Sequence, residues 1–119
     1  MADQIETVNA VITSTRLGIE DHGVLSFTLG VEGDGWGQGF GGICLDNPPD
    51  KSGEDRKPSI LPGYLLARLF SVLGVGKWED LKGQHVRIRR NWNQIYSIGH
   101  YTRDKWFALE ELETVAKGK

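Results

Sequence analysis

Two arginines, Arg87 and Arg89, stand two positions apart in a segment where basic and apolar residues alternate. Side chains two positions apart on a β-strand point to the same face, about 6–7 Å from one another. Two guanidinium groups at this spacing can hold phosphate or carboxylate oxygens with paired hydrogen bonds. We therefore expect Arg87 and Arg89 to bind an anion, with Arg68 of a predicted helix as a third cation. The alternative is a solvent-exposed sheet face whose arginines pair with acidic side chains.

Aromatic residues are interleaved with further basic residues around this arginine pair. The aromatic ones are Trp92, Tyr96, Tyr101 and Trp106, and the basic ones are Arg90, Arg103 and Lys105. Such a mixture suits a surface that stacks on nucleobases and neutralises phosphate. It equally suits an ordinary core, where aromatic rings supply large buried area.

Glycine occupies every second position of the stretch 35–41. Because successive side chains of a strand point to opposite faces, this pattern leaves one face bare and sends Trp36, Gln38 and Phe40 to the other. Glycine weakens a strand, and it is used where something must approach the backbone closely. We expect this bare strand to admit another backbone, a second subunit or a flat ligand, with Phe40 or Trp36 stacking on a base.

The same stretch contains the spacing of a dinucleotide-binding loop at Gly37, Gly39 and Gly42. That motif needs a helix to open at its end, so that helix N–H groups receive the pyrophosphate. Here residues 43–45 continue as a strand and Pro48 follows soon after. The pattern therefore does not predict a dinucleotide loop.

Neither a metal site nor a catalytic set stands out among the histidines, the cysteine and the acids. His22, His85 and His100 lack the spacing of metal ligands. Cys44 lies in a strand that we expect to be buried, where a thiol usually serves as a small hydrophobic group. Asp21 and His22 are neighbours on a predicted turn and so face different ways. We expect no metal, no cofactor and no enzymatic activity, and we favour binding over catalysis.

Composition limits the class of protein. At 119 residues, 39% hydrophobic and 25% charged, the chain predicts one globular domain, residues 1–119, with a core of its own. One cysteine cannot form an intrachain disulfide, and the N-terminal residues lack the pattern of a signal peptide. No apolar stretch reaches the roughly 18 residues of a membrane span. We expect a cytoplasmic protein that does not enter a membrane.

The net charge of −2 conceals two halves of opposite sign. Residues 1–55 carry ten acidic side chains against two basic ones, and residues 56–119 carry twelve basic against six acidic. Such halves can pair within the fold, pair between subunits, or expose a basic patch to an anion. The overall acidity makes nucleic acid an unlikely partner.

The elements that must position these residues are strands in both halves of the chain and a helix between them. Alternating or β-favouring patterns predict strands over 4–16, 25–31, 35–45, 85–91, 94–100 and 105–107. Leucines at helical spacing between Pro62 and Gly74 predict one helix, and residues 109–115 predict another. This order predicts an α+β fold, an antiparallel β-sheet of about five to six strands with two helices packed on it.

Longer motifs run through the whole chain. They read LGIEDHG at 17–23, GQGFGG at 37–42 with Leu45 and Asp46, and VGKWEDLKG at 75–83, with Ile98–His100 and Lys105–Phe107 beyond them. In this order and spacing they resemble a family of small proteins encoded by phages and prophages. Small phage proteins of this kind often counter host defences, and one class of similar size and α+β character inhibits Thoeris immunity by sequestering cyclic ADP-ribose signals. The resemblance implies an anti-defence role and assigns no ligand-binding residue.

Our leading hypothesis is a homo-oligomer that binds and sequesters a small cyclic nucleotide without catalysis. In this hypothesis Arg87 and Arg89, with Arg68, hold the phosphates, while Phe40 or Trp36 stacks on the base. The alternative is a protein-binding inhibitor of a host defence complex, of an anti-CRISPR kind, which would use the acidic segment 46–55 to imitate nucleic-acid charge. Binding of single-stranded nucleic acid is a third hypothesis, weakened by the acidity of the chain.

Overall fold

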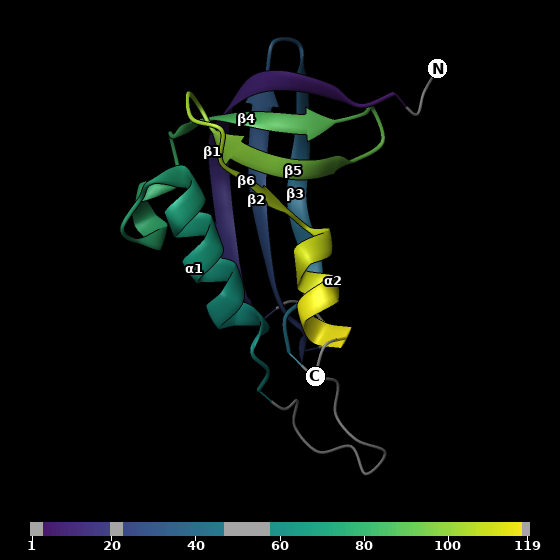
Figure 1. The fold of residues 1–119 in the computed structure, drawn as a ribbon, viewed down its shortest axis with the longest axis vertical. Coiled ribbons are helices and arrows are strands. Elements are labelled where there is room, and N and C mark those ends of the chain that lie inside the picture. Colours follow the sequence, from purple (N-terminus) through teal and green to yellow (C-terminus); the bar gives the residue numbers. More distant parts are fainter. Residues whose placement is uncertain (1–3, 20–22, 47–57, 118–119) are drawn as a thin grey trace.

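The computed structural model describes residues 4–19, 23–46 and 58–117 of the chain. They form a six-stranded antiparallel sheet contacted by two α-helices (Figure 1), which confirms the predicted fold class. The Asp21–His22 pair and all but the start of the acidic segment 46–55 lie outside the described residues. The elements are β1 (Glu6–Ile19), β2 (Leu25–Gly33), β3 (Trp36–Cys44), α1 (Leu61–Leu73), the 3-10 turn η2 (Trp78–Asp80), β4 (His85–Arg90), β5 (Ile95–His100), β6 (Trp106–Ala108) and α2 (Glu110–Lys117).

The sheet is built around β1, which belongs to two layers at once. The strand order is β3-β2-β1-β4-β5-β6. Residues 6–11 of β1 pair with β4, and residues 11–19 pair with β2. The register with β2 shifts between Ile12 and Ser14, and such a bulge bends a strand. In Figure 1 the layer of β4, β5 and β6 therefore runs across β2 and β3, which lie behind it.

Helix α1 begins and ends at residues suited to those positions. Pro62 stands in the first turn, where a backbone N–H would have no partner within the helix. Gly74 follows the last turn with a left-handed φ of 73°, and its N–H donates to the carbonyl of Phe70 at 2.8 Å. The buried side chains of α1 are Leu65, Leu69, Val72 and Leu73. The spacing of apolar residues thus predicted both this helix and its buried face.

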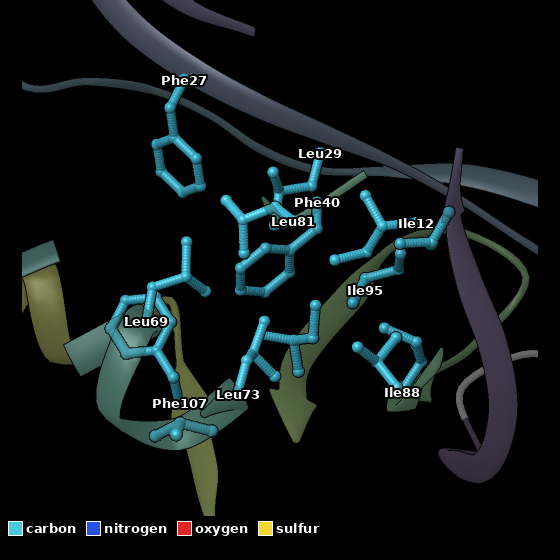
Figure 2. Packing of buried hydrophobic residues seen from close by; sticks show 14 of the residues in the cluster. Ile12, Phe27, Leu29, Phe40, Leu69, Leu73, Leu81, Ile88, Ile95 and Phe107 are labelled. Carbon is cyan, nitrogen blue, oxygen red and sulfur yellow. The ribbon is translucent and has the colours of Figure 1, made fainter. Parts of the chain in front are cut away.

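The core lies between the two strand layers and α1. Figure 2 shows Leu29 and Phe40 from one layer, Ile88 and Ile95 from the other, and Leu69 from the helix within one buried cluster. The ring of Phe40 contacts those of Phe27 and Phe107 edge to face, with centroids 6.1 and 6.0 Å apart, a favoured geometry for aromatic pairs. Because Phe107 belongs to β6 and Phe27 to β2, these three rings join the two layers.

Side chains also bring the edge strand β3 to the turn between β4 and β5. The side-chain amide of Gln38 donates to the carbonyl oxygens of Asn91 at 3.2 Å and Trp92 at 3.3 Å. Its own oxygen accepts a hydrogen bond from Arg90, which also forms an ion pair with Glu6 of β1. The sheet is thereby curled so that β3 approaches β5 without a backbone ladder between them among the described residues.

Candidate anion-binding face

The side chains of Arg87 and Arg89 project from β4 on the side turned away from the core, as their alternation with buried apolar residues predicts. In the ladder Arg87 lies opposite Gly99 of β5, which lies opposite Trp106 of β6. Residues opposite one another share a face of the sheet. We call the surface formed by Arg87, Arg89, Gly99, Trp106 and the β5–β6 turn (101–105) the outer face.

Arg89 is exposed, and its guanidinium lies over the ring of Trp106, 3.8 Å from the ring centroid. At an exposed site this cation–π contact is worth about 0.5–1 kcal/mol. The guanidinium N–H groups of Arg89 have no hydrogen-bond or ion-pair partner among the described residues. The contact with Trp106 therefore orders the arginine while leaving its donors available to a ligand.

Arg87 is held more firmly, because its guanidinium donates to two backbone carbonyls. Its Nε donates to the oxygen of His100 at 2.9 Å, and its Nη2 donates to the oxygen of Arg103 at 2.7 Å. The guanidinium carbon also lies 4.9 Å from the ring centroid of Trp106. Arg87 thus clamps the β5–β6 turn onto β4 and contributes its positive charge beside Arg89.

Trp106 packs closely against β5 because the residue opposite it is glycine. A Cβ atom on Gly99 would lie 2.6 Å from Cε3 of Trp106 and 2.9 Å from the carbonyl oxygen of Lys105, too close for a side chain. The indole Nε1 donates to the carboxylate of Asp104 at 3.2 Å. In the sequence, Trp106 stands among the interleaved aromatic residues and was not predicted to belong to the site. The overlooked signal is an isolated glycine inside a strand, which marks a close approach.

Arg68, the third predicted cation, lies on the helix side of β6 and is committed to Glu111 of α2. Its Nε and Nη2 donate to the two carboxylate oxygens at 2.9 and 3.1 Å, and Nη2 also donates to the backbone oxygen of Trp106 at 2.8 Å. Its guanidinium lies 6.0 Å from the ring centroid of the buried Phe107. Arg68 therefore joins α1, β6 and α2 and does not share the outer face with the other two arginines.

The carboxylate of Glu111 accepts two further hydrogen bonds where α1, β6 and α2 meet, a contact that we call the junction. The hydroxyl of Tyr64 donates to it at 2.7 Å, and the backbone N–H of Ala108 donates at 3.1 Å. Burial raises the pKa of Glu111, but the hydrogen bonds from Arg68, Tyr64 and Ala108 outweigh burial and lower this pKa to about 2. The same carboxylate raises the pKa of Tyr64. The junction is a structural element of the fold.

Phe40 and Trp36, the predicted stacking residues, do not reach the outer face. Phe40 is fully buried between the rings of Phe27 and Phe107, which corrects the expectation that it stacks on a ligand. Trp36 is half-buried and lies under the guanidinium of Arg90, 4.2 Å from its ring centroid. The alternation correctly assigned both rings to one face of β3, and that face turns out to be the inner one.

Two other expectations are also corrected. Arg90, expected to extend the basic patch, is only 9% exposed because it follows Arg89 and so points to the inner side of β4, where it pairs with Glu6. Cys44, expected to be buried, is exposed at the end of β3, and its thiol donates to the carbonyl oxygen of Asp46 at 2.9 Å. The cationic surface is therefore smaller than the sequence indicated.

The bare face predicted for the glycine-rich strand is confirmed. Gly37 and Gly39 are exposed on the side of β3 away from the core, and Gly39 lies opposite Gly30 of β2. These glycines stand at the β3 edge of the sheet, whereas Trp106 stands at the β6 edge. The glycine-rich strand and the arginine pair therefore belong to two separate surfaces.

A recess of about 380 Å³ lies between β3, β5 and the start of α2. Gly41 and Ile43 line it from β3, and the acidic residues Glu110 and Glu113 line it from α2. None of the candidate arginines borders it. Two carboxylates repel a phosphate, so this recess does not suit an anion.

Comparison of the chain with protein-family models, curated proteins and solved structures finds no match. Within the described ranges, no three side chains of His, Cys, Asp or Glu gather closely enough to hold a metal ion. In the same part of the chain, no helix is both long and apolar enough to span a bilayer.

Proposed function

We propose that this protein binds a small phosphorylated nucleoside, of the cyclic nucleotide kind, on the outer face and sequesters it without chemical change. The observation that carries the proposal is the stack of Arg89 on Trp106, in which an exposed, ordered guanidinium keeps its donors unoccupied. Nucleobases stack on planar guanidinium groups as well as on aromatic rings. The plane of Arg89 can therefore receive a base, and its N–H edge can receive a phosphate.

The surroundings of Arg89 add positive charge on the same face. Arg87 lies over the same tryptophan, and the exposed Arg103 and Lys105 stand in the adjoining turn. Asp104, the one acid of that turn, accepts a hydrogen bond from Trp106. Charge-assisted hydrogen bonds from arginine to phosphate are about twice as strong as neutral ones. These groups can position and neutralise a phosphate, which is the chemistry of binding.

Thermal unfolding in the presence of cyclic ADP-ribose isomers and cyclic dinucleotides tests the proposal. A ligand at 100 times its dissociation constant adds about 2.7 kcal/mol to the free energy of unfolding, which raises the melting temperature by about 10 °C. Ligand recovered after denaturation should be chemically intact, whereas altered ligand would indicate an enzyme. If no member of the panel raises the melting temperature, the proposal fails.

A pair of charge-matched variants locates the site. Arg89→Ala should abolish the shift, because it removes both the stacking plane and the unoccupied donors. Lys117→Ala removes one positive charge from the exposed end of α2 and should leave the shift unchanged. Equal loss in both variants would mean that general charge, and not the outer face, attracts the ligand.

Single-stranded nucleic acid is a second candidate, favoured by the order of the strands. β1 pairs with both β2 and β4, α1 connects β3 to β4, and β3 approaches β5. This arrangement resembles the five-stranded, partly open barrel of OB-folds, which bind oligonucleotides with the loop between the fourth and fifth strands among others. In this protein that loop carries Trp92, which is 69% exposed.

Oligonucleotides of increasing length separate the two candidates. The affinity for a single strand should rise with its length. The logarithm of this affinity should fall by about 0.7 per phosphate contacted for each tenfold increase in salt concentration. Trp92→Ala should weaken binding of the single strand. A compact nucleotide should bind without regard to Trp92. Homo-oligomer formation and the anti-defence role implied by the sequence motifs stay predictions. So does the protein-binding alternative, whose acidic segment lies almost wholly outside the described residues.

A further inference from the structure

Two consecutive turns of the sheet are held by the same hydrogen-bond pattern. In the β4–β5 turn, the side-chain oxygen of Asn91 accepts hydrogen bonds from the backbone N–H groups of Asn93 at 2.8 Å and Gln94 at 2.9 Å. These donors stand two and three positions after the acceptor. A side-chain oxygen that accepts in this way fixes the turn that follows it.

In the β5–β6 turn a histidine takes the place of the asparagine. Nδ1 of His100 accepts hydrogen bonds from the backbone N–H groups of Thr102 and Arg103, both at 3.1 Å and again two and three positions after the acceptor. An imidazole nitrogen can accept only while it carries no proton. Unlike the amide of Asn91, this acceptor is lost when the ring becomes charged.

The turn held by His100 supports the outer face. The carbonyl oxygens of His100 and Arg103 are the two acceptors that hold Arg87. The backbone of Lys105, next to Trp106, is bonded at both ends to the same turn, since its N–H donates to Arg103 and its carbonyl accepts from His100. A disordered turn would therefore release Arg87 and loosen Trp106, the ring on which Arg89 lies.

We propose that His100 is a positioning residue that makes anion binding on the outer face sensitive to pH, an inference that rests on the proposed function of that face. Histidine is the side chain whose charge commonly changes within the physiological pH range. When Nδ1 of His100 gains a proton, it loses its two backbone donors, the β5–β6 turn loosens and the affinity for the anion falls. Ligand binding, by reciprocal linkage, favours the uncharged ring.

The sign of the effect separates positioning from simple attraction. A histidine that gains a positive charge beside an anion site strengthens binding by Coulomb attraction. The positioning role predicts the reverse, weaker binding at acidic pH. A decrease in affinity on acidification is thus a result that attraction by a charged His100 cannot produce.

Besides Asp104 and Lys105 of its own turn, few titratable and charged groups stand around His100 among the described residues. His85 of β4 and Tyr101 line the same recess as His100, and their rings contact one another at a tilt of 53°, with centroids 5.4 Å apart. Arg87 and Arg103 contact its backbone turn, and a Cβ atom placed on the uncharged Gly74, which follows α1, would lie 3.9 Å from the far side of the ring. No carboxylate lines this recess. His85 is accordingly the group that must be controlled for.

Three proteins compared at two pH values test the proposal, with cyclic di-AMP as the probe because its phosphodiesters keep their charge in this range. For the unmodified protein we expect the affinity to be about tenfold lower at about pH 5 than at about pH 7.5, because a charged imidazole cannot accept hydrogen bonds from the turn. His100→Asn copies the acceptor of the neighbouring turn without its titration and should bind at both pH values alike. His85→Gln should retain the decrease seen in the unmodified protein.

Unchanged or stronger binding by the unmodified protein at low pH would overturn the proposal, as would an equal decrease in His100→Asn. A second measurement needs no ligand and no variant. Hydrogen-exchange protection of the Thr102 and Arg103 amides, corrected for intrinsic rates, should drop on acidification, while that of Asn93 and Gln94 should stay constant. If cyclic di-AMP binds at neither pH but this drop occurs, the turn responds to pH and the proposed function of the face fails. Constant protection of all four amides refutes the role of His100 whether or not the probe binds.

Discussion

Replacement of Glu111 by glutamine is expected to remove a substantial part of the stability of this protein. The carboxylate accepts hydrogen bonds from Arg68, Tyr64 and the backbone of Ala108, with two donors on each oxygen. An amide has one oxygen, so its NH₂ group must face one of these pairs of donors. Glu111→Gln therefore loses the charge and also leaves donors without an acceptor.

The size of the effect follows from the pKa of this carboxyl. A pKa lowered from 4.5 to about 2 corresponds to about 3 kcal/mol of stability at neutral pH. Because the side chain is 25% exposed, solvent screening reduces our expectation to about 2 kcal/mol. In a domain of this size such a loss lowers the melting temperature by about 10 °C.

The pH dependence has a definite sign. A carboxyl whose pKa is lowered on folding stabilises the protein above its unfolded pKa, and this contribution is lost as the pH falls through the folded value. The unmodified protein should therefore lose about 2 kcal/mol more than Glu111→Gln between pH 4.5 and about 2. Urea unfolding at neutral pH and across this window measures both differences.

A neighbouring substitution provides the control. Glu113→Gln removes the same charge from an exposed position on the same helix and should change the stability by less than about 0.5 kcal/mol. The reasoning is refuted if Glu111→Gln and Glu113→Gln unfold at the same urea concentration. It is also refuted if the unmodified protein and Glu111→Gln lose equal stability on acidification.

Two further substitutions test the packing of the sheet. Gly99→Ala should destabilise the protein and shift the tryptophan fluorescence, because a Cβ atom at that position would lie 2.6 Å from Trp106. Gly39→Ala is the control, since a Cβ atom there would lie an acceptable 3.4 Å from Thr28. Similar melting temperatures for the two variants would contradict the packing described for Trp106. Phe40→Ala should lower the free energy of unfolding by about 3–5 kcal/mol, as expected for a buried phenylalanine. Calorimetry that shows a much smaller decrease would contradict the burial of Phe40.

The sequence predicted those features that depend on local spacing. The alternation around Arg87 and Arg89 gave the strand and its outward face, and the leucines between Pro62 and Gly74 gave the helix and its cap. Period-two spacing also groups the side chains of a strand into two sets. It correctly placed Phe40 with Trp36, but it does not say which set faces the core.

The remaining features depend on contacts between distant parts of the chain. The sequence indicated that Arg90 is a surface cation. In the structure β1 and β3 bring Glu6 and Gln38 to its guanidinium, and these contacts bury it. Trp106 acquires its role because β6 pairs with β5 and places the indole within reach of Arg89 on β4. No local pattern specifies these pairings, since each is decided by how the whole sheet is assembled.

The pairing of β1 with two strands also has a consequence for how this chain folds. Glu6 at the start of β1 lies opposite Arg90, so this half of the strand has no partner until most of the chain has been made by the ribosome. The strands β1, β2 and β3, by contrast, follow one another closely in the sequence and can pair early. Since non-local pairings slow folding, we expect the N-terminal half of β1 to join the sheet late, after the helix and the β4–β5 hairpin have emerged. Until then its apolar side chains are exposed to solvent. A truncated chain that ends before β4 should therefore aggregate.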